Sequence, residues 1–111
     1  MAEKLYVVFK LDKGEFGIHI MNVKEISPYE ESISLPNSPD FIEGVINYRG
    51  NVIPVINLKK RLSLGDMNIT KDTRIIVINI EEKEIGFIVD EASQTIRLND
   101  NQIDDTPNCI K

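Results

Sequence analysis

Apolar and β-branched residues alternate with polar residues along most of the chain, in short runs separated by turn residues. The first run, Leu5–Leu11, is followed by the turn Asp12–Glu15 and by a second run, Phe16–Ile20. Alternation with a period of two is typical of half-buried strands, and a short turn that contains Asp and Gly is typical of the connection between them. The pattern therefore predicts a β-hairpin at this end of the chain.

A different spacing follows the hairpin. Ile20, Val23 and Ile26 lie three residues apart, with polar residues between them. This spacing is typical of one face of a helix, and helical backbone is disfavoured just before a proline. The pattern predicts one or two helical turns that end at Ser27-Pro28, followed by a loop over residues 29–40. A loop of that length in a small domain usually packs across the fold or has a function.

Two further hairpins are predicted in the rest of the chain. Their strands are Phe41–Tyr48 and Val52–Ile56 around Arg49-Gly50-Asn51, and Thr73–Ile80 and Glu84–Asp90 around Glu81–Lys83. Because proline donates no backbone hydrogen bond, the strand that contains Pro54 is expected at a sheet edge or at a bulge. Asn57 is expected to cap a short helix over Leu58–Leu62.

Ala92–Leu98 is a last strand candidate and brings the number of predicted strands to seven. Helices are only short connectors in this pattern, so the expected architecture is all-β, with one barrel or two paired barrels. A chain of 111 residues has the size of one small domain that can bury a real core. Two independent domains are not expected.

The charge of the chain bears on its partners. Thirteen Lys and Arg stand against 18 Asp and Glu, which gives a formal net charge of −5. Nucleic-acid surfaces need clustered basic residues and exposed aromatic rings, and only 6% of the residues are aromatic. A protein partner is therefore expected rather than a nucleic acid. The apolar runs are too short to insert in a bilayer and the N-terminus lacks a secretion signal, which favours a cytoplasmic location.

Few residues could carry chemistry. One cysteine, Cys109, closes no internal disulfide, and one histidine, His19, leaves no Cys/His set for a metal. No phosphate-binding, zinc-protease or serine-hydrolase motif occurs. His19 alternates with Ile18 and Ile20, which suits a surface or packing role, and carboxylate pairs such as Glu81-Glu82 fall in turns. The expected class is a binding protein without catalytic residues, metal or cofactor.

The segment Phe41–Leu58 closely resembles the signature of the CheW family, the bacterial chemotaxis coupling proteins, in which an F-I-x-G-V-x-N-x-R-G-x-x-[IV]-P-[IV]-[IV]-[DN]-L run occurs. Phe16–Ile18 with Val23–Ile26 is similar to an earlier family segment, and Gly86–Asp90 to a later one. The resemblance extends from residue 5 to about residue 103. It implies a single domain, built as two small intertwined SH3-like β-barrels with short connecting helices, and no catalytic activity.

The resemblance also implies partners. A CheW-type adaptor joins the cytoplasmic hairpin tip of methyl-accepting chemotaxis receptors to the regulatory domain of the histidine kinase CheA, in arrays at the inner face of the membrane. The family's receptor-contacting positions correspond to Val23, Glu25, Ile26 and Arg49, and a glycine linked to kinase binding corresponds to Gly44. Plainer interpretations stay open. Val23 could be core, Gly44 could be a backbone requirement, and the two charged residues could be solvated charges.

The opposite charges of Glu25 and Arg49 suggest a more specific hypothesis. We expect them to form an exposed ion pair between the predicted helix and the hairpin turn, which fixes the receptor-facing surface. A surface pair stabilises a fold by only about 0–1 kcal/mol. Its value would therefore lie in recognition rather than in stability.

The sequence departs from the family pattern at three places. His19 stands where relatives often carry an acidic or polar residue, Ala92 stands where a larger aliphatic residue is common, and the chain stops at Lys111, before the family's closing strands. One barrel is therefore expected to be incomplete, with an exposed edge near Ala92–Leu98 that favours dimerisation or strand swapping.

Two alternatives to the adaptor remain. One is a CheW-like domain of a related signalling protein, such as the kinase regulatory domain or an adaptor fused to a receiver domain. The other is a small β-barrel that binds a metabolite or an oligonucleotide. The net charge and the low aromatic content oppose the second alternative.

Overall fold

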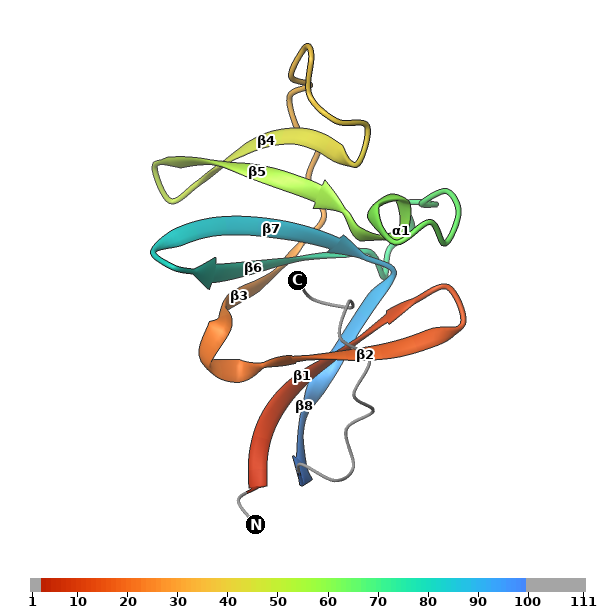
Figure 1. Cartoon of the computed structure of the whole chain (residues 1–111), viewed down its shortest axis with the longest axis vertical. Coiled ribbons are helices and arrows are strands. Elements are labelled where there is room, and N and C mark those ends of the chain that lie inside the picture. The colour runs from red at the N-terminus through yellow and green to blue at the C-terminus, as the bar shows by residue number, and fades with distance from the viewer. Residues whose placement is uncertain (1–2, 100–111) are drawn as a thin grey trace.

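The computed structural model describes residues 3–99, which form eight strands in two sheets (Figure 1). The strands are β1 (Glu3–Leu11), β2 (Gly14–His19), β3 (Val23–Pro28), β4 (Ile42–Tyr48), β5 (Asn51–Asn57), β6 (Arg74–Ile80), β7 (Lys83–Val89) and β8 (Glu91–Asn99). One sheet has the strand order β2-β1-β8, and the other has the order β3-β6-β7-β5-β4. The predicted all-β class is confirmed, with one strand more than the seven expected.

The path of the chain interlocks the two sheets. β1 and β2 begin the three-stranded sheet, the next five strands build the other sheet, and β8 then returns to pair with β1 (Figure 1). This antiparallel pairing runs from Glu3 opposite Asn99 to Lys10 opposite Glu91. Within residues 3–99, β8 pairs only with β1 and lies at a sheet edge, as expected for Ala92–Leu98. Dimerisation through that edge stays a prediction.

β6 and β7 are buried on both faces and are shared by two hydrophobic cores. The first core lies between the sheets and includes Ile76 and Ile78 of β6 with Phe9 and Leu11 of β1. The second core is enclosed by the five-stranded sheet. Its buried residues are Ile46, Ile53, Val55, Ile75, Val77 and Ile88. Uninterrupted apolar runs are typical of strands that are covered on both sides, and β6 shows such a run.

The helix predicted after the first hairpin is wrong. Only a single 3-10 turn, η1 (Ile20–Asn22), is present, and the residues that follow form β3. His19 caps this turn, because its Nδ1 accepts the Met21 N–H at 3.2 Å, and its ring meets the Tyr6 ring edge-on at 5.3 Å between centroids. His19 therefore has the packing role that the sequence favoured.

A β-bulge explains why the spacing resembled a helix. Lys24 is an extra residue in β3, so that Val23 and Glu25 lie opposite consecutive residues of β6. The extra residue shifts the alternation of side chains along the strand. Val23 and Ile26 therefore lie across from two residues of β6 that face the first core. Glu25 lies across from a residue of β6 that faces the second core. Two apolar residues three apart share a face here without a helix.

The loop predicted over residues 29–40 is irregular, and it packs across the fold as expected. Ile33 and Val45 exchange two backbone hydrogen bonds of 2.9 Å, which lay the middle of the loop along β4. The loop therefore covers the outer edge of that strand.

The short helix α1 (Leu58–Arg61) confirms the predicted cap. Asn57 Oδ1 accepts the Lys60 N–H at 3.1 Å, which satisfies one of the free amides of the first turn. No helix in the described range, residues 3–99, is long and apolar enough to cross a membrane.

The prediction for Pro54 is wrong, because β5 lies inside its sheet, between β7 and β4, and the nearby bulge is in β4. Pro54 is opposite Val45, whose own N–H and C=O bond to Ile33 on the other side. The nitrogen of Pro54 therefore points toward β7, and the pairing of β5 with β7 begins only at Val55. The missing N–H removes no hydrogen bond from either neighbour.

Candidate partner-binding surface

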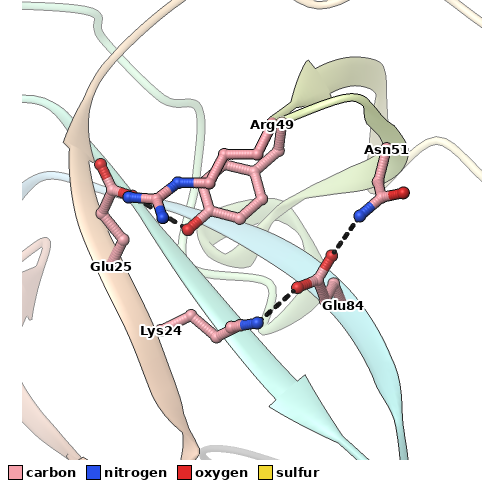
Figure 2. Close-up of polar contacts among 6 residues, drawn as sticks. Lys24, Glu25, Arg49, Asn51 and Glu84 are labelled. Atoms are coloured by element: carbon pink, nitrogen blue, oxygen red, sulfur yellow. Dashed lines mark hydrogen bonds and ion pairs between the residues drawn. The ribbon is translucent and has the colours of Figure 1, made fainter.

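Glu25 and Arg49 form the ion pair that the sequence predicted (Figure 2). Arg49 Nη2 lies 2.8 Å from Glu25 Oε1. Glu25 belongs to β3 rather than to a helix, and Arg49 lies in the turn between β4 and β5. Because β3 and β4 are the two edges of the five-stranded sheet, the pair joins those edges and closes the sheet around the second core. The Arg49 side chain is 73% exposed, so the pair stabilises the fold by only about 0–1 kcal/mol.

Tyr48 completes this contact, and the sequence analysis did not single it out. Its hydroxyl donates to the same Glu25 Oε1 at 2.9 Å, and its ring packs against the second core. Burial and the hydrogen bond to Glu25 raise the pKa of Tyr48 above its ordinary value. Glu25 is thus held by one donor anchored in the core and by one exposed donor. The position of Tyr48 beside Arg49 was visible in the sequence, whereas the partner of its hydroxyl was not.

The turn between β4 and β5 fixes the direction of Arg49. Arg49 and Gly50 have φ angles of 50° and 86°, the signs required in a type I′ hairpin turn. Asn47 Oδ1 accepts the Gly50 N–H at 2.9 Å and supports the turn. Arg49 adopts a backbone conformation that costs an L residue roughly 1–2 kcal/mol. The surrounding contacts therefore hold Arg49 in place against its own backbone preference.

A second set of polar contacts lies beside the first (Figure 2). Lys24 Nζ is 3.0 Å from Glu84 Oε2, and Asn51 Nδ2 is 3.5 Å from Glu84 Oε1. The bulge in β3 directs Lys24 and Glu25 toward the same side (Figure 2). Positive and negative charges thus alternate along four residues that we name the charge row: Arg49, Glu25, Lys24 and Glu84. Sequence reasoning missed Lys24 and Glu84, because β3 and β7 are brought near each other only by their separate pairings with β6, and the pairing of β3 with β6 is a long-range feature.

An open groove of about 600 Å³ lies next to the charge row, between the start of β5 and the β6–β7 hairpin. It exists because β5 pairs with β7 only from Val55 onward. Val52, Pro54 and Ile85 line the groove, and Val52 is 68% exposed. Glu84 of the charge row also lines it. Apolar walls with a charged rim are typical of a surface that binds a protein segment.

Val23 and Ile26 lie on the other side of β3 from Glu25. Val23 is half-buried against the first core, and Ile26 is 37% exposed. The structure therefore brings Glu25 and Arg49 together but places these two apolar residues apart from them.

Gly44 is buried in β4 beneath the loop over residues 29–40. A Cβ at this position would meet the backbone carbonyl of Ile33 and would lie 2.8 Å from the Ser32 hydroxyl oxygen. The backbone interpretation of Gly44 is therefore supported by a close approach of the loop.

The described part of the chain contains no cluster of metal ligands. Within residues 3–99, no three His, Cys, Asp or Glu side chains lie together as metal ligands would. Cys109 lies outside the described residues.

Comparison with known proteins gives the family. The chain matches the CheW-like domain over residues 5–110. The chemotaxis protein CheW of Bacillus subtilis is 39% identical over 110 residues, which cover 99% of this chain and 70% of that protein. The CheW of Klebsiella aerogenes is 34% identical, over 92% of this chain and 61% of that protein. The chain therefore belongs to the CheW-like domain family.

A solved structure agrees with the fold. The crystal structure of the scaffolding protein TtCheW from Thermoanaerobacter tengcongensis matches with a TM-score of 0.83 at 40% sequence identity. The match covers 91% of this chain and 66% of the solved chain. The chain thus spans between 61% and 70% of the length of these three relatives.

Proposed function

We propose that this protein is a non-catalytic chemotaxis adaptor that couples methyl-accepting chemotaxis receptors to the regulatory domain of the histidine kinase CheA. Its place is the cytoplasm, in receptor arrays at the inner face of the membrane. Family membership supports this function, since the relatives are named chemotaxis protein CheW and scaffolding protein. The observation that carries the proposal is the Glu25–Arg49 pair, formed at the positions that the resemblance assigns to receptor contact.

The receptor contacts Glu25, Arg49 and the groove beside them in this proposal. Glu25 Oε1 accepts both of its donors, and within the described residues no donor reaches its Oε2. That oxygen is available to a donor of the receptor. Val52 supplies exposed apolar area for the hydrophobic hairpin tip. Apolar contact then supplies affinity, while the alternating charges select the orientation.

Val23 and Ile26 contribute in different ways. Because Val23 packs against the first core, it holds β3, the strand that carries Glu25, in place. Ile26 is partly exposed and extends the apolar area on the other side of β3. An alanine at Val23 is therefore expected to lower the free energy of unfolding, whereas an alanine at Ile26 is expected to change mainly receptor binding.

The kinase regulatory domain contacts the loop above Gly44 rather than Gly44 itself. Gly44 is buried, whereas Ile33 and Leu35 in that loop are 73% and 44% exposed. A side chain at Gly44 would displace the loop and so disturb the apolar surface that it presents.

A capture experiment tests the proposal. The tagged protein is incubated with the CheA regulatory domain and with a receptor cytoplasmic fragment, separately and together. We expect both to be captured, E25K and R49E to lose the receptor fragment, and G44V to lose the kinase domain. K13Q, on the exposed β1–β2 turn, is the control and should retain both partners. Failure of the unmodified protein to capture either partner would contradict the adaptor function.

A further inference from the structure

Asp90 joins three segments at the point where the chain passes from one sheet to the other. It is the only residue between β7 and β8. Its Oδ2 lies 3.2 Å from Nζ of Lys59 in α1 and accepts the N–H of Asp12, in the β1–β2 turn, at 2.7 Å. Its own N–H donates to the Lys10 carbonyl at 3.0 Å. One residue thus connects α1, which follows β5, with the first hairpin.

Lys59 is unusual because it is buried, with 8% of its surface exposed. A buried ammonium group without a partner is costly, since it has lost its hydration. Asp90, whose side chain is 25% exposed, supplies the opposite charge. Truncation of either side chain would leave the other charge in a partly dry environment.

Asp12 depends on the same carboxylate. Its φ angle of 57° lies in the left-handed region, which costs a residue with a side chain roughly 1–2 kcal/mol. The hydrogen bond from its N–H to Asp90 is charge-assisted and therefore among the stronger kinds. The conformation of the hairpin turn is thus tied to the state of the residue that links β7 of one sheet to β8 of the other.

We propose that Lys59 and Asp90 form a latch that sets the orientation of the β1–β2 hairpin against the five-stranded sheet. The first core holds the two sheets together through apolar contact, which has no preferred direction. The hydrogen bonds of Asp90 are directional, so they fix the position of the turn. Lys59 and Asp90 are positioning residues. Without the pair, the turn opens as a local unit while β6 and β7 stay folded.

Hydrogen exchange at single amides, measured by NMR on the whole chain, tests the latch. The Asp12 and Asp90 amides report on it directly, because both are donors in this cluster. In K59M we expect both amides to exchange at least about tenfold faster than in the parent protein, while the Ile76 amide changes much less. K59R, which keeps the charge, should restore most of the protection.

K10M is the matched control. It breaks the exposed pair between Lys10 of β1 and Glu91 of β8, in which Nζ lies 3.6 Å from Oε1 and the side chains are 48% and 44% exposed. We expect K10M to leave the Asp12 and Asp90 amides unchanged. D90N keeps an acceptor oxygen while it removes the charge, so it serves as the second variant if K59M does not fold. Exchange that is unchanged at Asp12 and Asp90, or that rises equally at Ile76, would overturn the latch.

Discussion

The backbone of Ile33 occupies the space that a side chain at Gly44 would need, because the Ile33–Val45 bridge lays the loop directly over β4. The carbonyl carbon of Ile33 lies 2.7 Å from the position of a Cβ at Gly44. This relationship gives a physical reason for a glycine in the middle of the family signature. It also separates the role of Gly44 from that of the loop that covers it.

A side chain at Gly44 should destabilise the protein through this loop. We expect G44A to lower the free energy of unfolding by about 1–3 kcal/mol, as overpacking does. Urea denaturation measures the loss, and hydrogen exchange should show loss of protection at the Ile33 and Val45 amides. G50A is the control for backbone conformation, because Gly50 has a positive φ but no atom near its missing Cβ. Intact protection at Ile33 in G44A would contradict this account.

The Glu25–Arg49 pair should matter more for recognition than for stability. We expect E25R and R49E each to change the free energy of unfolding by about 1 kcal/mol or less, and each to abolish capture of a receptor fragment. The double variant E25R/R49E should regain part of the capture, because the opposite charges are restored in exchanged positions. If the double variant binds no better than either single one, the pairing does not fix the receptor-facing surface.

The raised pKa of Tyr48 makes stability depend on pH in the alkaline range. The folded protein keeps the phenol protonated at a pH where the unfolded chain, with a pKa of about 10, begins to lose the proton. The stabilisation is therefore fully present below pH 10 or so and is lost as the pH rises through the folded pKa. We expect the free energy of unfolding to fall more steeply above this pH in the parent protein than in Y48F. Urea denaturation at a series of alkaline pH values measures the difference, and equal slopes would refute it.

Substitutions in the turn between β6 and β7 should make the protein more stable. Glu81 and Glu82 have φ angles of 50° and 67°, as a type I′ turn requires, yet neither is a residue that favours positive φ. We expect E81N/E82G to raise the free energy of unfolding by about 0.5–2 kcal/mol. E81A/E82A removes the same charges and keeps the strain, so it separates the two causes in a thermal unfolding experiment. A gain in E81A/E82A as large as in E81N/E82G would assign the effect to charge.

The sequence predicted local features better than long-range ones. Hairpins and the Asn57 cap depend on neighbouring residues, and all are present. β3 was missed because the bulge at Lys24 produces a spacing of three within a strand. Pro54 was misplaced because the partial pairing of β5 with β7 depends on segments about 30 residues apart in sequence.

In the candidate partner-binding surface, too, local features were predicted and long-range contacts were missed. The charges of Glu25 and Arg49, read with the family resemblance, were enough to predict their contact. Tyr48 and Glu84 were not predicted to belong to this surface, because the sheet register decides which side chains reach them. Lys59 was not singled out from the sequence, since its burial follows from the packing of α1 against β7.

The two faces of β6 have a consequence for how the molecule melts. Ile76 and Ile78 belong to one core while Ile75 and Val77 belong to the other, so loss of this strand removes both cores at once. The two hydrophobic cores are separate, but β6 forms one side of both. The two halves should therefore unfold in a single cooperative transition, and a cavity made in one half lowers the stability of the other by the same amount.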